Sequence, residues 1–301
     1  MSTVTMRAMT LALVAVAAPF ARAETLEKQS SAAVTVARGD ENVSGSKRAT
    51  HDERSRTRWR DDWCTSCGFR PSEASASGAS APPRRVIWLI RHGQATAERA
   101  DADDGERELT ALGRTQAAMT AKRLRELIEN ETSGSEREPR IMVHSTMTRA
   151  RQTADIIAEN AFPRVERRAC ELIRERAPVR PEPDTWKQSE ETHRADAPLV
   201  EEGFRSIFHR PAASADAPAA TDVADATDAA RERVVHEVYV AHGNVIRYSV
   251  LRALQLPPDA WLRFGVYNAS ITRVEVSPAG RVSLRCMGDA GHLPPSALTW
   301  N

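Results

Sequence analysis

Short, mostly apolar runs alternate with segments of helical periodicity from residue 84 onward. Val86–Ile90 is apolar throughout, and the strands expected at Ile141–His144 and Val234–Ala241 are mostly apolar. A strand that is covered on both faces is apolar at every position, whereas a strand with one wet face alternates between apolar and polar residues. The runs therefore predict an α/β fold with a mostly parallel sheet and helices on both of its faces.

The segments between these runs have the capping residues and apolar spacing of helices. We expect helices over residues 110–130, 148–160, 199–208 and 245–256. Thr110 and Thr148 stand where the first two helices need an N-cap, and Pro257-Pro258 ends the last one. The expected apolar face of the first helix consists of Leu112, Met119, Leu124, Leu127 and Ile128.

Two further apolar segments close the folded part. Ile271–Val276 and Val282–Met287 flank Pro278-Ala279-Gly280, which is the pattern of a β-hairpin. A hairpin adds antiparallel strands, so we expect the sheet to be mixed. The domain that these elements form is expected to span residues 84–301.

Three segments are expected to lie outside the packed core. Residues 1–23 begin with a positive charge, continue apolar and end in Ala21-Arg22-Ala23, which is typical of a secretory signal peptide. A mitochondrial or plastid leader, or a short N-terminal membrane anchor, fits nearly as well, because no acidic residue precedes Glu24. Residues 24–83 have the composition of a flexible spacer, and residues 211–230 that of a low-complexity insert in the domain.

Charge and cysteine content exclude several classes of protein. The 42 Lys and Arg residues against 41 Asp and Glu residues leave a net charge of +1, which argues against a nucleic-acid-binding protein. Four cysteines in 301 residues do not make a disulfide-rich scaffold. Cys64 and Cys67 have metal-knuckle spacing, but no second pair completes a zinc site, so we interpret them as free thiols.

Three groups of chemically active residues come directly after predicted strands. Arg91-His92-Gly93-Gln94 follows the first strand, residues 144–150 (HSTMTRA) belong to the end of the second, and His242-Gly243-Asn244 follows a later one. Ligands in open α/β sheets bind at the carboxyl ends of the strands, so we expect these residues to share one crevice. A lone His near a strand end is usually structural, whereas several strand ends that each supply His, Arg or Gly indicate a site.

The residue types suit the transfer of a phosphoryl group. Arg91 and Arg149 each present a planar fork of donors that stays charged and can clamp a phosphoryl group bidentately. A neutral imidazole can attack phosphorus, and a protonated one can stabilise the charge that develops. Glu175 is the candidate acid for the leaving oxygen. Residues 101–105 (DADDG) miss the spacing of a calcium loop, and we interpret them as a polar loop beside the site.

Four spaced motifs resemble those of the histidine phosphatase, or phosphoglycerate mutase-like, superfamily. Arg91-His92-Gly93 resembles its RHG motif, and residues 109–117 (LTALGRTQA) resemble its LTxLGxxQA segment. Residues 145–154 (STMTRARQTA) resemble its SxxxRAxxTA segment, and His242-Gly243-Asn244 resembles its second-histidine motif. The motifs arrive in the family's order over roughly residues 85–293, and the resemblance implies a phosphoglycerate mutase-like fold.

The resemblance also implies a role for each candidate residue. His92 is implied as the phospho-acceptor and Glu175 as the proton donor. Arg91, Arg149 and His242 are implied to hold the phosphate, with His242 also counted among the catalytic residues. The resemblance implies no metal ion and no cofactor.

Within the superfamily, the chain resembles a branch of mitochondrial serine/threonine protein phosphatases. The segments that carry this resemblance are residues 144–150, 175–178, 244–248, 254–258, 261–263, 268–272 and 288–295. It implies phosphoprotein substrates and a mitochondrial, membrane-associated location, with attachment through the N-terminal segment. A secretory location is the alternative if residues 1–23 are a cleaved signal peptide.

The spacer contains a further motif of this branch. Trp59-Arg60-Asp61-Asp62-Trp63 resembles a WDxNWD segment that drives multimerisation and activation in the branch, and both tryptophans keep their spacing. Arg60, Asp62 and Cys64 depart from that pattern. We expect Trp59 and Trp63 to mediate homo-oligomer assembly; the alternative is that the pair pins the spacer onto the domain of its own chain.

These observations lead to one principal hypothesis and two alternatives. The principal hypothesis is a metal-independent phosphatase that acts through a phosphohistidine on phosphoserine or phosphothreonine in proteins. The alternative enzyme is a small-molecule phosphomonoesterase. The alternative of another class is an anchored oligomeric scaffold with a vestigial site, which is disfavoured because every expected catalytic position is filled.

Overall fold

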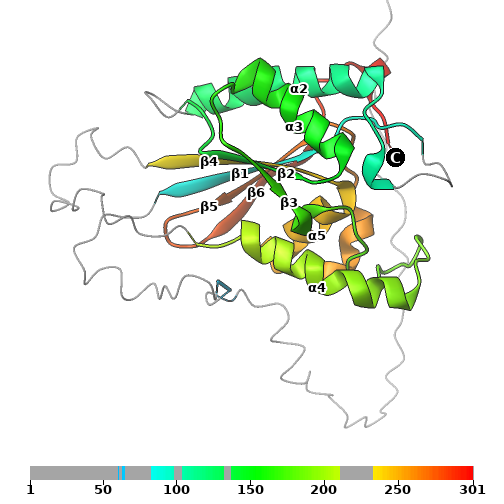
Figure 1. Cartoon of the computed structure of the whole chain (residues 1–301). Helices are drawn as coiled ribbons and strands as arrows, with labels where there is room; N and C mark the ends of the chain where they lie inside the picture. Colours follow the sequence, from blue (N-terminus) through cyan, green and yellow to red (C-terminus); the bar gives the residue numbers. More distant parts are fainter. Residues whose placement is uncertain are drawn as a thin grey trace, which may run out of the picture. The chain divides into compact units, whose positions relative to one another are not determined.

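Six strands form one mixed sheet (Figure 1). The computed structural model describes residues 60, 63–64, 83–97, 104–131, 137–210 and 233–300. The strands lie side by side in the order β3 (Arg167–Cys170), β2 (Ile141–Ser145), β4 (Val234–Ala241), β1 (Arg84–Arg91), β5 (Ile271–Val276) and β6 (Val282–Asp289). The first four strands run parallel, β5 is antiparallel to β1, and β6 is antiparallel to β5. The predicted α/β fold with a mixed sheet is confirmed.

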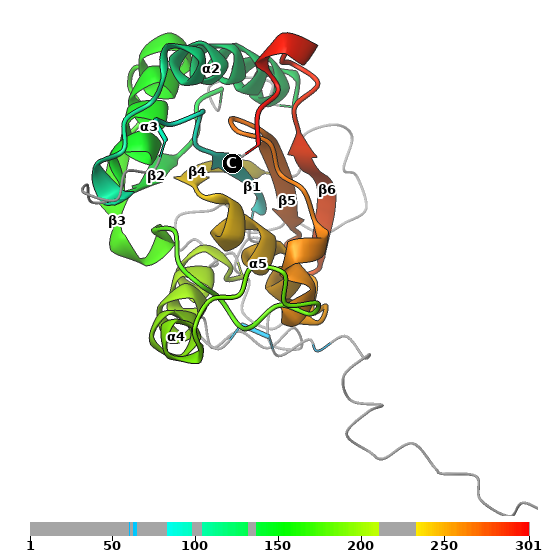
Figure 2. The same cartoon turned by 90° about the vertical axis from the view of Figure 1, so that its right-hand side faces the viewer.

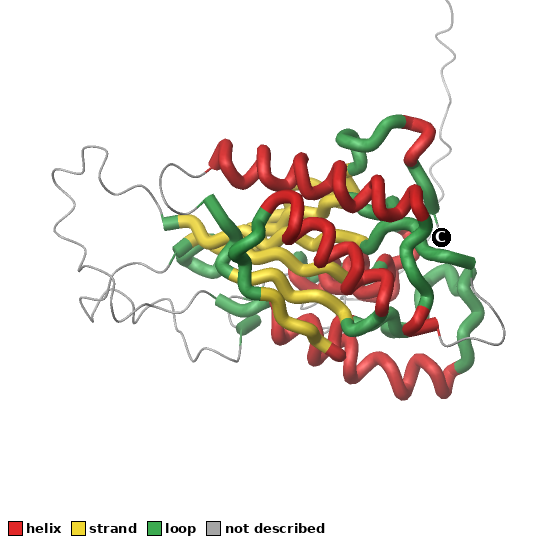
Figure 3. Tube along the Cα trace, turned by 45° about the horizontal axis from the view of Figure 1, so that its top comes forward, coloured by secondary structure: helices red, strands yellow, loops and turns green. Residues whose placement is uncertain are grey.

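Helices cover both faces of this sheet. α2 (Ala111–Glu131) and α3 (Thr148–Ala161) pack on one face, and α4 (Glu190–Ile207) and α5 (Gly243–Ala253) pack on the other (Figures 1 and 2). Figure 3 shows the same layers by secondary structure. The connecting segments contain the 3-10 helices η1 (Asp104–Glu106), η2 (Glu171–Ile173), η3 (Pro258–Arg263) and η4 (Pro295–Ala297).

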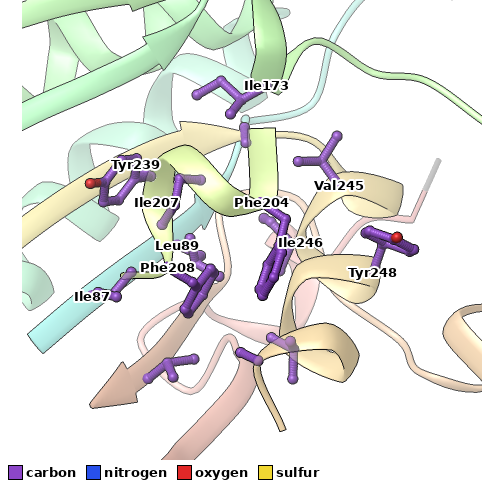
Figure 4. Close-up of a cluster of buried hydrophobic side chains, with 14 of the residues drawn as sticks. Ile87, Leu89, Ile173, Phe204, Ile207, Phe208, Tyr239, Val245, Ile246 and Tyr248 are labelled. Carbon is purple, nitrogen blue, oxygen red and sulfur yellow. The ribbon is translucent and has the colours of Figure 1, made fainter. Parts of the chain in front are cut away.

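β1 shows why an uninterrupted apolar run forms a central strand. Val86, Trp88 and Ile90 belong to the hydrophobic cluster with α2 and α3, whereas Ile87 and Leu89 belong to the cluster with α4 and α5. Figure 4 shows the second of these clusters. All five side chains are at most 1% exposed, and burying a side chain of this size contributes roughly 2 kcal/mol. Packing of side chains on both faces therefore stabilises β1 as a central strand.

Two elements differ from the sequence prediction because they are polar. The sequence does not predict β3, since this edge strand has exposed residues at its first three positions and no apolar run. α4 begins well before the predicted start at Leu199 and contains Pro198. Its N-cap is Ser189, whose side chain accepts a hydrogen bond of 3.0 Å from the Thr192 amide.

The ends of three helices can be compared with the predicted ones. Thr110 caps α2 as predicted, because its hydroxyl accepts a hydrogen bond of 3.0 Å from the Gly113 amide. The prediction that Thr148 caps the next helix is wrong: Thr148 is the first residue of α3, and the N-cap Met147 makes no side-chain capping bond. The predicted helix 245–256 begins and ends earlier, as α5.

The apolar face predicted for α2 is only partly correct. Leu124 and Ile128 are buried, whereas Leu112, Met119 and Leu127 are half-buried. The rest of the buried face consists of small or polar residues, namely Gly113, Gln116, Ala117, Thr120 and Ala121. Small side chains allow a helix to lie close to its neighbours, so the buried face is not the most apolar one.

Several predictions concern residues beyond the described ranges. The expected targeting segment 1–23, the insert 211–230 and nearly all of the spacer 24–83 lie outside the described residues. All described residues belong to one compact unit. None of the helices in the described ranges has the length and hydropathy that crossing a bilayer requires.

The connections after two neighbouring strands leave the sheet toward opposite faces. The chain leaves β1 toward α2 on one face of the sheet, but it leaves the neighbouring β4 toward α5 on the opposite face. Strand ends from which the chain departs to opposite faces leave a gap between the connections, and ligands of open α/β sheets bind there. The predicted site residues lie at this point.

Candidate active site

The residues predicted to form a site lie together at the carboxyl ends of the parallel strands, the end that faces the viewer in Figure 2. Arg91 ends β1, His92 follows it, and Arg149 lies in the first turn of α3 after β2. His242 follows β4 as the N-cap residue of α5, and Glu175 follows η2. The ring centroids of the two histidines are 5.0 Å apart.

Close backbone packing fixes the loop that carries His92. A side chain at Gly93 would collide with the carbonyl oxygen of Gly113 in α2, so only glycine allows this approach. The Gly93 amide donates to Thr153 Oγ1 at 3.1 Å, and the His92 amide donates to the Ala241 carbonyl at 3.0 Å. The histidine is therefore held between α2, α3 and the end of β4.

The hydrogen bonds of His92 determine which ring nitrogen carries its proton. Nδ1 lies 2.7 Å from the Gly93 carbonyl oxygen, which only accepts, so Nδ1 is protonated and Nε2 has a free lone pair. Arg149 Nε donates to this Nε2 at 3.2 Å. Burial, together with the charges of Arg91 and Arg149, lowers the pKa of His92 well below its ordinary value. His92 is thus a neutral imidazole whose lone pair faces an anion-binding group.

Arg149 is a nearly buried guanidinium with one carboxylate partner. Its Nη2 donates to Asp104 Oδ2 at 3.0 Å, and its Nη1 donates to the Asp104 carbonyl at 2.7 Å. The Arg149 side chain is 4% exposed, whereas that of Asp104 is 41% exposed. Arg107 binds the other carboxylate oxygen of Asp104 at 3.0 Å. Asp104 in η1 therefore occupies the fork that an anionic ligand would use, so this end of the predicted polar loop lies beside Arg149, whereas residues 101–103 lie outside the described residues.

Arg91 supplies a second guanidinium at the base of the site. Its Nη1 donates to the Val266 carbonyl at 2.8 Å. Burial lowers the pKa of Arg91 to about 10, and the nearby carboxylate of Glu175 partly opposes this effect. Arg91 therefore remains charged at neutral pH although it is 5% exposed.

His242 is fully buried beside the two arginines. Its Nε2 lies 2.9 Å from Ser145 Oγ, which holds the ring orientation. Its Nδ1 makes no hydrogen bond and lies 4.0 Å from Glu175 Oε2. Burial and the proximity of His92 lower the pKa of His242 well below its ordinary value. An imidazole placed in this way can contact a substrate oxygen through Nδ1.

Glu175 is poised to titrate near neutral pH. Burial raises the pKa of its carboxyl group from the ordinary 4.5 to about 7, although Arg91 and Arg149 act in the opposite direction. The Asn244 amide donates to Glu175 Oε1 at 3.3 Å. A carboxyl group with this pKa can both donate and accept a proton at neutral pH. The site therefore combines a neutral imidazole, two guanidinium groups and a titratable carboxyl group.

Trp63 lies on the domain of its own chain, away from these residues. Its Nε1 donates to the Gly280 carbonyl at 3.0 Å, and its ring packs against the cluster that includes α4 and α5. The Arg60 amide donates to Gln255 Oε1 at 2.7 Å. Trp59 lies outside the described residues.

Comparison with known protein families decides the class of this site. The family model described as "Histidine phosphatase superfamily (branch 1)" matches residues 87–289, which include all five site residues. The chain belongs to the histidine phosphatase superfamily.

Several curated proteins are similar to this histidine phosphatase. "Serine/threonine-protein phosphatase PGAM5, mitochondrial" of Mus musculus is 39% identical over 221 residues, which is 73% of this chain and 67% of the mouse protein. The Drosophila melanogaster protein of the corresponding name is 38% identical and covers 75% of this chain and 70% of its own length. A crystal structure of phosphoglycerate mutase from Plasmodium falciparum is 26% identical, with a TM-score of 0.45, and covers 73% of this chain and 99% of its own.

Sequence reasoning gave no individual role to several polar residues of this histidine phosphatase site. Ser145 and Asn244 lie inside the recognised motifs, and this was the signal that the sequence offered. The structure shows that Ser145 contacts His242 and that the Asn244 backbone amide contacts Glu175. Asn268 also lies in a recognised segment, 268–272, but its contact with the His92 carbonyl, at 3.3 Å, joins residues far apart in the chain and could not be read from the sequence.

Proposed function

We propose that this histidine phosphatase hydrolyses phosphoserine and phosphothreonine in proteins through a phosphohistidine, without a metal ion or cofactor. The observation that carries the proposal is the unprotonated Nε2 of His92, whose lone pair accepts a hydrogen bond from the Arg149 guanidinium at an anion-binding position. The similar proteins of mouse and fly, which bear the name serine/threonine-protein phosphatase, support the substrate class.

The first step transfers the phosphoryl group to the enzyme. The lone pair of His92 Nε2 attacks phosphorus, and the bond between phosphorus and the serine or threonine oxygen breaks. The proton of the Glu175 carboxyl group passes to that oxygen, so an alcohol rather than an alkoxide leaves. Arg91 and Arg149 stabilise the charge that spreads over the phosphoryl oxygens, and His242 contacts the same group.

The second step releases inorganic phosphate. Water attacks the phosphohistidine and gives its proton to the Glu175 carboxylate that the first step produced. The bond between phosphorus and Nε2 then breaks, and its electron pair returns to the His92 nitrogen. A pKa of about 7 suits Glu175 to both steps, because each step begins with the opposite protonation state.

Replacement of His92 by Ala tests the chemistry. We expect His92→Ala to abolish phosphate release from phosphopeptides, measured with chelator present, and to prevent the trapping of a phosphorylated enzyme. His209→Ala is the matched control, because His209 is half-buried and follows α4 rather than the site strands. Full activity of His92→Ala would refute the proposal. Faster turnover of sugar phosphates than of phosphopeptides by the unaltered enzyme would favour the small-molecule alternative.

We also propose that the chain assembles into a homo-oligomer through Trp59 and Trp63. The contacts of Trp63 with Gly280 and with the α4–α5 cluster support a docking surface for this motif. The same contacts suit a Trp63 that belongs to a second copy. Trp63→Ala should lower the mass in solution, measured by light scattering. An unchanged mass together with a lower melting temperature would instead favour pinning of the spacer within one chain.

Turnover of the Trp63→Ala variant separates the remaining alternatives. Loss of assembly with unchanged hydrolysis would indicate a separate scaffolding role, whereas loss of both would indicate activation through assembly. We place the protein in mitochondria, because the similar proteins are named mitochondrial, with residues 1–23 as the membrane attachment. Fractionation of cells that express the chain with and without residues 1–23 tests this location against the secretory alternative.

A further inference from the structure

Arg247 is a half-buried cation beside the site that the proposed chemistry does not use. It lies on α5, one helical turn after Asn244, and its Nη1 donates to Asn244 Oδ1 at 3.3 Å. Its Nε is buried without a hydrogen-bond partner. Within the described ranges, Arg247 makes no ion pair with a carboxylate closer than 4.0 Å. A half-buried guanidinium whose buried Nε has no partner is costly unless a ligand completes its hydrogen bonds.

Gly243 shows how close Arg247 comes to Arg91. A Cβ atom at Gly243 would lie 3.5 Å from Arg91 Nε and 3.7 Å from Arg247 Nη1. The distance between Arg91 Nε and Arg247 Nη1 cannot exceed the sum of these two distances. The two guanidinium groups therefore lie within about 7 Å of each other. Burial and, to a smaller extent, the charge of Arg247 lower the pKa of Arg91, whereas burial lowers the pKa of Arg247 and the nearby carboxyl group of Glu175 opposes that effect. The pair favours an anion between or beside the two groups.

Asn244 connects Arg247 to the acid of the reaction. The Asn244 amide binds Glu175 Oε1 at 3.3 Å, and its side chain binds Arg247. On the other flank, Arg174 directly precedes Glu175 and donates to Thr146 Oγ1 at 3.0 Å. The Arg174 side chain is 29% exposed, and its nearest carboxylate, at 3.6 Å, belongs to Glu171, which is 66% exposed. Arg174 is therefore only loosely neutralised.

The position of these arginines determines which part of a substrate they meet. Glu175 gives its proton to the leaving oxygen, so the polypeptide attached to that oxygen must pass beside Glu175. Arg149 contacts the nucleophilic nitrogen of His92, so it meets the phosphoryl group. Arg174 and Arg247 bind Thr146 and Asn244 instead, so we expect them to meet the substrate chain next to the phosphorylated residue.

We infer that Arg247, with Arg174, forms a second anion-binding point that selects phosphoserine or phosphothreonine with Asp or Glu close by in the substrate chain. This inference rests on the proposed function, because it places the substrate chain by the direction of the leaving group. A carboxylate suits the site because it can accept two hydrogen bonds from one guanidinium. This second point would select among phosphorylated peptides, whereas Arg91 and Arg149 act on the phosphoryl group.

Paired phosphopeptides test the inference. The two peptides differ only in the residues that flank phosphoserine, which are Asp and Glu in one and Asn and Gln in the other. We expect the unaltered enzyme to hydrolyse the acidic peptide with a kcat/KM on the order of fivefold higher, as for one partly exposed charge pair. Arg247→Gln should bring this ratio close to one, and Arg247→Lys should retain part of it. A third peptide, with Lys on both sides of phosphoserine, should be hydrolysed faster than the acidic peptide by Arg247→Glu.

The ratio of the two peptides distinguishes a lost preference from a general loss of activity. Arg164→Gln is the matched control, because its side chain is 83% exposed and lies at the opposite end of the strands. Equal turnover of both peptides by the unaltered enzyme, or an unchanged ratio in Arg247→Gln, would overturn the inference and leave the proposed function intact. Hydrolysis of an aryl phosphate but of neither peptide would overturn the proposed function itself.

Discussion

The raised pKa of Glu175 leads to a prediction about how activity depends on pH. Burial brings this pKa to about 7, so the carboxyl group is about nine-tenths protonated at pH 6 and about one-tenth protonated at pH 8. The first chemical step needs the protonated form, and kcat/KM reports that step. An exposed carboxyl group with the ordinary pKa of 4.5 would be ionised throughout this interval. The activity that Glu175 provides should therefore fall about tenfold between pH 6 and pH 8.

Glu175→Gln isolates this contribution. The amide keeps the shape of the side chain but has no proton to transfer, and loss of a general acid costs on the order of 10²- to 10⁴-fold in rate. We expect the ratio of kcat/KM between unaltered enzyme and variant, measured on a phosphoserine peptide, to be largest at pH 6 and about tenfold smaller at pH 8. An aryl phosphate, whose leaving group departs without a proton, should show a much smaller ratio at every pH.

The ratio between the unaltered enzyme and Glu175→Gln is insensitive to the titration of the substrate itself. The phosphate of phosphoserine itself loses a proton near pH 6, which alters binding to both enzymes alike and cancels in the ratio. A ratio that stays flat from pH 6 to pH 8 would refute the assigned pKa. A ratio of equal size for the peptide and the aryl phosphate would refute the role of Glu175 as the acid.

Three further substitutions test the geometry of the site. Asp104→Asn removes the charge that occupies the Arg149 fork, so the inhibition constant of inorganic phosphate should fall severalfold. A weaker or unchanged affinity for phosphate, or an equal change in the control Glu106→Gln, would contradict this. Ser145→Ala removes the bond that orients His242 and should lower kcat about tenfold at unchanged folding, measured by kinetics beside circular dichroism. Gly93→Ala should destabilise the fold by about 2 kcal/mol or more, measured by urea unfolding, because its Cβ meets the carbonyl of α2; unaltered stability would show that the loop can move.

The parts of the fold that the sequence predicts well are those whose burial is uniform. β4 and β5 have the predicted bounds, 234–241 and 271–276, because their predominantly apolar residues are buried along nearly the whole strand. α4 and β3 are not predicted well, since their polar residues give no periodic signal and tertiary contacts determine where they begin. A proline inside α4 also gives a misleading helix boundary.

The candidate site divides in a similar way. The residues that follow strands could be predicted to lie together, because the topology of an open α/β sheet brings strand ends to one edge. Glu175 follows a 3-10 helix rather than a strand, and its place beside His242 required the family resemblance. Asp104 and Arg247 could not be assigned a contact in advance, since each depends on how a loop or a helix packs in three dimensions.

The two arginines that flank the reaction differ in what a substrate must displace. The Arg149 fork already binds a carboxylate and a carbonyl of Asp104, so the phosphoryl group has to replace contacts of comparable charge. Among the described residues, Arg247 has one long hydrogen bond to Asn244 and an electrostatic interaction with Glu175 but no close ion pair, so an acidic neighbour of the phosphorylated residue replaces little. Binding of that neighbour is already complete before phosphorus is attacked, and it stabilises the bound substrate and the transition state alike. The preference for acidic peptides should therefore appear in KM, with kcat nearly the same for both peptides.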